Sequence, residues 1–342
     1  MSPKENNPDE VIVMPVISKL GWNHTPDQPV GLTPLFDWPP SPKKIIQWIS
    51  GIWLRASIRS AILALSILTW LFLQPDTSRV VTFKFDWIAE MYLRNLALMT
   101  VVAGGLHLWL YCYKKQGADQ QFDTRDLSRI SARFTFGKQV YDNIFWTLAS
   151  GVTIWTAFEV VTMWGYANGY VPYLAFNDNP AWFVLLFLLQ PLWGGFHFYW
   201  IHRALHWPPL YRLAHSLHHR NINVGPWSGM SMHPIEHIMY LSGVLIHWVI
   251  ASHPIHFLFH MQVKTLEAVT SHAGHQKLVV SKGTEYELGD FFHQLHHRYF
   301  ECNYGTIEMP LDRWFGTFHS GTVSDSKKIK MRKHREHKET QR

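Results

Sequence analysis

The stretch HRALHWPPLYRLAHSLHH, residues 202–219, decides the fold, because it places five histidines immediately after a long apolar segment. It holds a His-x-x-x-His pair followed by a His-x-x-His-His triplet, and a second triplet of the same spacing occurs in HQLHH, residues 293–297. On a helix, positions i, i+3 and i+4 share one face, so each cluster presents its imidazoles together. The eight histidines of these clusters are His202, His206, His215, His218, His219, His293, His296 and His297.

The number of clustered histidines exceeds what chance or a single metal ion explains. The chain has 22 histidines among 342 residues. At that frequency one such triplet arises by accident in roughly one chain in ten, so two triplets and a pair are not accidental. Imidazole binds iron, copper, zinc and nickel, and eight imidazoles are more than one ion needs. The clusters therefore predict a multinuclear metal site beside a bilayer.

Composition narrows the chemistry and excludes one class of partner. The chain has only two cysteines, so metal ligands must come from histidines and carboxylates. Its 17 tryptophans suit a membrane interface, where amphipathic rings gather. The net charge of +6 is spread over several loops and forms no compact basic stripe with interleaved aromatic residues. We therefore expect no nucleic-acid partner.

Four apolar blocks have the length of a membrane span. We predict an all-α integral membrane protein with four transmembrane helices and a His-rich helical cap on the cytoplasmic side, holding a di-metal site. A fifth apolar stretch, 238–261, is interrupted by histidines and a proline. It is expected to form a re-entrant hairpin, an interfacial helix pair or a double crossing. The four predicted spans are residues 57–73, 88–113, 144–167 and 181–201.

The distribution of positive charge predicts the topology. Six Lys and Arg residues lie in 114–138 and four lie in 43–59, whereas 168–180 has none. By the positive-inside rule, both termini are cytoplasmic, in a bacterial inner membrane or the endoplasmic reticulum. The clusters after residues 201 and 292 must reach one site. The stretch 238–261 therefore crosses the membrane either not at all or twice.

The local sequence suggests how the clusters are supported. Pro208 and Pro209 end the fourth helix, and a new helix is expected from there to about Asn221. Metal-bound histidines usually pass the second ring N–H to a carboxylate or carbonyl group. His272 lies where a further ligand can reach the site, and His275 and His233 are secondary candidates. The candidate carboxylate partners are Glu236, Asp290 and Asp312, with Glu267 and Glu287 as further acidic neighbours.

In their order and spacing, the clusters resemble the fatty acid hydroxylase / sterol desaturase superfamily of integral-membrane di-iron oxidases. HPIE at 233–236, NYG at 303–305 and LDRWFGTF at 311–318 are most similar to the lathosterol oxidase type of sterol desaturase. The resemblance covers about residues 140–320. It implies that the eight cluster histidines and His272 bind two iron ions. It also implies O2 as co-substrate, a bilayer lipid as substrate and electrons from a separate reductase or small carrier.

We expect four regions along the chain. They are a flexible polar N-terminal arm (1–45), two spans with a basic loop (46–140), the hydroxylase-like domain (141–320) and a basic tail (321–342). The leading hypothesis is desaturation or hydroxylation of a sterol C–H bond. A fatty acyl, sphingoid or alkylglycerol lipid hydroxylase is the alternative within the class. A His-rich metal transporter, metal-binding protein or haem subunit would be another class. A transporter places its ligands within broken helices at midplane, whereas these clusters follow the spans. The sequence leaves open the lipid, the oxidised carbon, the electron donor and the oligomeric state.

Overall fold

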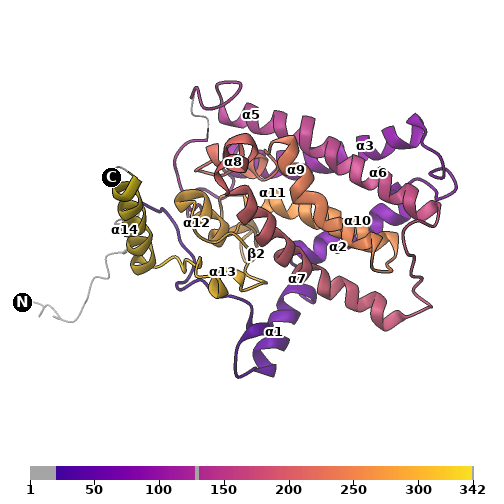
Figure 1. Cartoon of the computed structure of the whole chain (residues 1–342), viewed down its shortest axis with the longest axis horizontal. Coiled ribbons are helices and arrows are strands. Elements are labelled where there is room, and N and C mark those ends of the chain that lie inside the picture. Colours follow the sequence, from indigo (N-terminus) through magenta and orange to yellow (C-terminus); the bar gives the residue numbers. More distant parts are fainter. Residues whose placement is uncertain (1–20, 128–130, 341–342) are drawn as a thin grey trace, which may run out of the picture.

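A computed structural model describes residues 21–127 and 131–340 of the chain, and these are predominantly helical (Figure 1). Three continuous helices are long and apolar enough to cross a membrane: Phe85–Cys112, Gln139–Ala167 and Pro180–Leu205. A fourth passes the same test only as a bent pair, Pro42–Trp53 with Ile58–Leu73, whose halves meet at 48°. The predicted all-α membrane protein is confirmed, with the first span as the second half of a bent pair.

Short π-helical turns divide the first three of these long helical segments, in chain order, into several elements, whereas α7 (Pro180–Leu205) is continuous. Figure 1 shows α3, α6 and α7 extending toward one side of the molecule, with the C-terminal elements at the other. The spanning elements are α1 (Pro42–Trp53), α2 (Ile58–Leu68), α3 (Phe85–Met99), α4 (Gly105–His107), α5 (Gln139–Phe145), α6 (Thr153–Ala167) and α7 (Pro180–Leu205).

The bend between α1 and α2 has a local cause. Ser57 starts α2 with a capping box: its hydroxyl accepts from the Ser60 backbone N–H at 3.1 Å, and Ser60 Oγ accepts from the Ser57 N–H at 2.9 Å. Such a reciprocal cap satisfies free N–H groups at a new helix start, so the chain restarts its helix there instead of continuing α1.

The stretch 238–261 is part of a helical hairpin whose returning arm is buried in the protein. Its outgoing arm is α9 (Pro234–Leu241) with a 3-10 turn, and its returning arm is α10 (Pro254–Gln262), continued to α11 (Ala268–Ser271). At the tip, the Ser252 N–H donates to Pro172 O at 3.1 Å, in the loop that precedes α7. The tip therefore lies at the end of α7 opposite its histidines.

This hairpin satisfies the constraint that both clusters reach one site. The outgoing arm begins on the side of the histidines and the returning arm ends there, so the chain returns to where it started. Phe257 and Phe259 on α10 are fully buried against neighbouring helices. The outgoing arm leaves Ile238, Leu245 and Val249 exposed, so the hairpin has an apolar edge at the surface as well as a buried returning arm.

A buried ion pair joins two of the spanning helices. Arg94 on α3 pairs with Glu159 on α6, and Asn95 Nδ2 donates to the second carboxylate oxygen at 3.0 Å. Glu159 is fully buried. Paired and hydrogen-bonded charges of this kind tolerate burial, whereas a single one does not.

Glu159→Ala should therefore reduce the free energy of unfolding by about 3–5 kcal/mol, because it leaves the Arg94 guanidinium buried without its partner. Glu90→Ala is the matched control, since Glu90 pairs with Arg79 in an exposed bridge at 2.8 Å, and such pairs contribute at most about 1 kcal/mol. Denaturation in detergent followed by circular dichroism measures both. Equal losses in the two variants would contradict the assignment.

The cap that follows the spans is made of short elements. A two-stranded antiparallel hairpin precedes the helix that carries the second triplet. The cap elements are α8 (Pro208–Leu210), β1 (Lys277–Ser281), β2 (Thr284–Glu287), α12 (Phe291–Tyr299), α13 (Leu311–Trp314) and α14 (Val323–Thr340).

Both chain ends pack on this cap where they are described. Trp22 is buried, with its ring centroid 5.1 Å from that of Phe291 and the Arg298 guanidinium 3.4 Å above it. The expected flexible arm is therefore wrong for residues 21–45, because an aromatic anchor holds the segment; residues 1–20 lie outside the described part. In the tail, Ile329 of α14 is buried in the same cluster.

Candidate metal centre

The structure gathers nine histidines into two adjacent groups. In each group, one nitrogen per residue lies within 4.8 Å of the others. All nine are buried except His206, which is partly buried. They are the eight cluster histidines and His272. The first group is His202, His206, His215, His219 and His296, and the second is His218, His272, His293 and His297.

Each triplet divides its histidines between the two groups. On α12, His296 joins the first group, whereas His293 and His297, one turn apart, join the second. The ring centroids of His219 and His297, in different groups, are 4.9 Å apart. The groups are thus two halves of one centre, as expected for a site that holds two ions.

The first triplet, His215, His218 and His219, lies on irregular backbone and not on the single helix expected to run to Asn221. After α8 the chain forms a π-helical turn, Tyr211–His215, and then a 3-10 turn, His218–Arg220. These turns change the angular spacing along the chain. His215 and His219 face the first group while His218 faces the second, the same i, i+4 against i+3 division that regular α12 gives its triplet.

Several of the ring nitrogens facing away from the centre are held by hydrogen bonds, whereas Nδ1 of His219 and of His297 has no partner among the described residues. Nδ1 of His202 lies 2.7 Å from Tyr304 O, and Nδ1 of His296 lies 2.6 Å from Cys302 O. Nδ1 of His272 lies 2.8 Å from a backbone carbonyl of α11. Carbonyls only accept, so these Nδ1 atoms carry the proton and their Nε2 lone pairs are free. This is the outer shell that orients metal-bound imidazoles.

The inward nitrogens fit a metal ion. His296 Nε2 lies 3.0 Å from His219 Nε2 and 3.1 Å from His206 Nε2, and His202 Nε2 is buried with no hydrogen-bond partner among the described residues. Lone pairs that converge in this way repel unless a cation lies between them. An all-imidazole donor set suits a transition metal such as iron, copper, zinc or nickel.

Burial also sets the protonation state of these histidines. It lowers the pKa of His206 and of His272 to about 3, and the pKa of His218 to about 4. All three imidazoles are therefore neutral near pH 7. The neutral form is the one that binds metal.

The three predicted carboxylates have different positions. Glu236 Oε1 accepts from His215 Nδ1 at 2.7 Å, and burial raises the Glu236 pKa well above its usual range. Asp312 contacts no grouped histidine directly. It accepts from the Tyr304 N–H at 2.9 Å and so holds the residue whose carbonyl contacts His202. Asp290 caps α12 by accepting from the Phe292 N–H at 2.8 Å, and burial raises its pKa to about 7.

The two secondary candidates lie outside both groups. Gly274, with φ of +71°, turns the chain between His272 and His275, so His275 packs its ring on Tyr111 at 5.4 Å instead. His233 caps α9, where its Nδ1 accepts from the Ile235 N–H at 3.3 Å. Sequence reasoning missed the carbonyls of residues 268, 302 and 304, because backbone acceptors leave no side-chain pattern.

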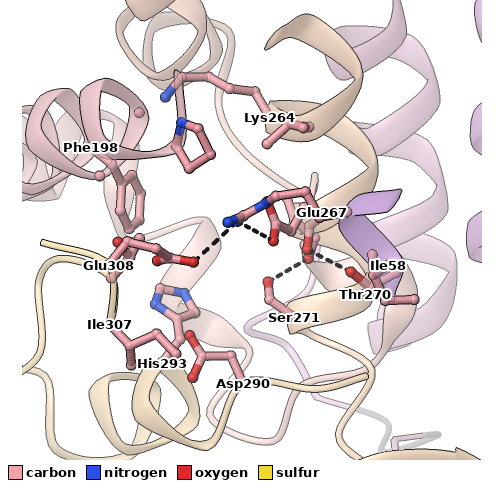
Figure 2. A pocket seen from close by; sticks show the side chains of 18 of the residues that line it. Ile58, Phe198, Lys264, Glu267, Thr270, Ser271, Asp290, His293, Ile307 and Glu308 are labelled. Carbon is pink, nitrogen blue, oxygen red and sulfur yellow. Dashed lines mark hydrogen bonds and ion pairs between the residues drawn. The ribbon is translucent and has the colours of Figure 1, made fainter. Parts of the chain in front are cut away.

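A cavity of about 750 Å³ opens beside the centre. Its walls include His202 and His293 together with apolar side chains such as Phe198 and Phe259. Figure 2 shows His293 and Asp290 at one end of this pocket and Lys264 at the other. Volume and lining are those of a site for a lipid-sized organic ligand.

A buried charged cluster lies in the middle of the cavity wall. Arg59 Nη2 lies 2.8 Å from Glu267 Oε1 and 3.1 Å from Glu308 Oε1. Glu267 therefore balances a guanidinium and has no role as an imidazole partner. The cluster ties α2 to the returning hairpin arm and to the loop before α13.

Comparisons with known proteins agree with this geometry. Residues 183–317 match the family model described as Fatty acid hydroxylase. The chain is 27% identical over 169 residues to Delta(7)-sterol-C5(6)-desaturase of Nicotiana tabacum, covering 47% of this chain and 60% of that protein. It is 28% identical over 152 residues to methylsterol monooxygenase 1 of Gallus gallus, covering 43% and 51%.

A Delta(7)-sterol 5(6)-desaturase of Eremothecium gossypii is 30% identical over 127 residues, covering 37% of this chain and 35% of that protein. The chain thus spans between about a third and three fifths of the length of these curated relatives. No solved structure matches.

Proposed function

We propose that the chain is a membrane-bound di-iron oxidase, because residues 183–317 match the Fatty acid hydroxylase family model. It uses O2 to desaturate or hydroxylate a C–H bond of a lipid, with sterols as the first substrate class. The observation that carries this proposal is the pair of interleaved histidine groups at the end of an apolar cavity. The similarity to sterol desaturases and a methylsterol monooxygenase supports it.

The proposed ligands are the nine grouped histidines, with one iron ion in each group. Iron bound there would supply oxygen activation and hydrogen abstraction, chemistry that belongs to the metal. The chain's own residues have other tasks. The carbonyls of Tyr304 and Cys302 and the Glu236 carboxylate fix the imidazole planes, and the apolar walls near Phe198 hold a C–H bond beside the centre and exclude water.

We place the centre and both termini on the cytoplasmic side. The basic loop 114–138 packs on the cap: the Phe122 N–H donates to Gly274 O at 2.9 Å, and Asn223 Nδ2 donates to the Arg125 carbonyl. The loop richest in positive charge and the histidines thus share one end of the bundle, which the positive-inside rule assigns to the cytoplasm. Electrons then come from a separate cytoplasmic reductase or small carrier.

The test is metal content and turnover of the purified protein. Elemental analysis of the detergent-solubilised chain should find about two irons per chain, one for each of the two histidine groups, because all-imidazole sites suit transition metals. With a reductant and O2, it should convert a sterol to a product that has lost two hydrogens or gained one oxygen, as detected by mass spectrometry.

Acyl lipids form the second substrate arm of this experiment. Conversion of these lipids alone would keep the oxidase and replace the sterol. Bound zinc, or no bound metal after iron reconstitution, would contradict the di-iron proposal.

A further inference from the structure

The cavity has a second polar end, far from the histidine centre. It follows α7 on one side and α10 to α11 on the other. Gln190 precedes His202 by twelve residues on α7, and His260 precedes His272 by twelve on the returning hairpin arm. At 1.5 Å per residue, both lie roughly 18 Å from the centre along their helices.

Gln190 presents an unused acceptor to this end. Its Nε2 donates to the His256 carbonyl at 2.7 Å, and a carbonyl only accepts, so the orientation of the amide is fixed. Its Oε1 is buried, has no hydrogen-bond partner among the residues described, and belongs to a cavity-lining residue. An acceptor left in this state costs free energy unless a donor occupies the cavity.

His260 presents a second unused atom. It is 1% exposed, and its Nδ1 lies 3.2 Å from His247 Nε2, which anchors it in a polar chain continued to Ser252. Its Nε2 is buried without a partner in the described part of the chain, and the residue lines the cavity. Gln190 Nε2 also approaches His247 Nε2, at 3.4 Å. Gln190 and His260 therefore both contact His247 Nε2, which places the two side chains next to each other.

Lys264 supplies a donor next to them. It follows His260 by one helical turn and so shares its face. It is 5% exposed and lines the cavity, and its Nζ lies 4.7 Å from the Tyr240 ring centroid. The structure gives it no carboxylate partner within the described ranges, because nearby Glu267 is bound by Arg59. Figure 2 shows Lys264 at the end of the pocket opposite His293.

We propose that Gln190, His260 and Lys264 form a subsite that binds the hydroxyl group of a lipid alcohol. A hydroxyl donates its hydrogen to Gln190 Oε1 or His260 Nε2 and accepts one from Lys264 Nζ. A carboxylate or phosphate has no hydrogen to donate to the amide oxygen of Gln190. A carboxylate would pair with Lys264 but leave Gln190 Oε1 and His260 Nε2 without a donor, whereas a hydroxyl group serves both kinds of partner. An ammonium group is repelled by the positive charge of Lys264. The subsite therefore favours neutral alcohols over fatty acids and amines.

This inference rests on the proposed function and adds an orientation to it. With the hydroxyl at the subsite, the lipid lies along the cavity. The carbon beside the histidines is then separated from the hydroxyl by most of the hydrocarbon.

The test is competition binding to the iron-loaded protein in nanodiscs, with a tritiated saturated 3β-hydroxysterol as probe. Competitors are the unlabelled sterol, its deoxy analogue, hexadecanol, hexadecane and hexadecanoate. The wild type should bind at least one alcohol about tenfold more tightly than its deoxy analogue, the effect of one to two well-placed hydrogen bonds. The sterol and hexadecanol arms identify which alcohol is preferred.

Two variants should abolish that preference. Gln190→Met and Lys264→Met keep the side-chain length and remove the polar atoms, so each should bind an alcohol and its deoxy analogue about equally. Lys264→Met removes a buried amine that lacks a carboxylate, so it should fold even if Gln190→Met does not.

Thr306→Val is the matched control. Thr306 Oγ1 is another buried, unpartnered atom of the same cavity, facing Gly195, which is nearer to the centre than Gln190. This variant should retain the preference for alcohols. The proposal is overturned if Thr306→Val loses the preference for alcohols while Gln190→Met and Lys264→Met retain it. It is also overturned if the wild type binds an alcohol and its deoxy analogue equally, which would mean that the subsite holds only water. Iron content and O2 consumption of the same preparations report on the proposed function separately.

Discussion

His296→Ala should remove most of the bound iron and lower the rate of lipid oxidation by more than about 100-fold. That loss exceeds the roughly 10–100-fold effect of removing a residue that only hydrogen-bonds to a metal ligand. His296 Nε2 lies near the middle of the first group, 3.0 Å from His219 Nε2 and 3.1 Å from His206 Nε2. Its loss removes an ion ligand and leaves neighbouring lone pairs unbalanced. Elemental analysis and product formation measure the two effects.

His275→Ala is the control for this experiment. His275 is also buried, but it lies outside both groups. This variant should keep its iron, and an equal loss of iron from both variants would indicate general misfolding. A His296→Ala protein with two irons and full activity would remove His296 from the proposed ligand set.

Glu236→Ala should have the second-largest effect, a loss of about 10–100-fold in iron affinity or activity. The carboxylate accepts from His215 Nδ1 at 2.7 Å and is the one acidic group that contacts a grouped imidazole among the described residues. Without it, the His215 ring loses its fixed orientation and part of its basicity. Chelator competition measures the iron affinity.

Two further variants separate hydrogen bonding from charge. Glu236→Gln keeps an acceptor oxygen for His215 Nδ1, so it should fall between Glu236→Ala and the wild type. Glu285→Ala, on the exposed face of β2, is the control and should leave iron affinity unchanged. If Glu236→Ala bound iron as tightly as this control, the carboxylate would have no part in holding the metal.

Local spacing predicted the grouping of histidines, and longer-range features explain what it could not. The i, i+3, i+4 spacing places the rings of His293, His296 and His297 next to one another on α12, with His296 in one group and the other two in the second. It could not reveal that π and 3-10 turns replace a helix after Pro208, because those turns are imposed by packing. Nor could it place His275, which Gly274 turns toward another element.

The apolar blocks predicted the long helices well, because each is long and continuous. The bend before α2 depends on a cap made by two serines, Ser57 and Ser60, which a hydropathy average does not register. Trp22 was assigned to a mobile arm because its neighbours are polar. Its ring packs against Phe291, and backbone hydrogen bonds such as Val30 N–H to Ser320 O hold the rest of the segment.

The division of each triplet between both histidine groups has a thermodynamic consequence. The backbone that presents His218 to one ion also presents His219 to the other, and α12 serves both in the same way. The conformational entropy lost in ordering this backbone falls on whichever ion arrives first. In the proposed two-ion centre, the next ion would meet ligands already arranged, so the two binding equilibria would be linked through this shared backbone.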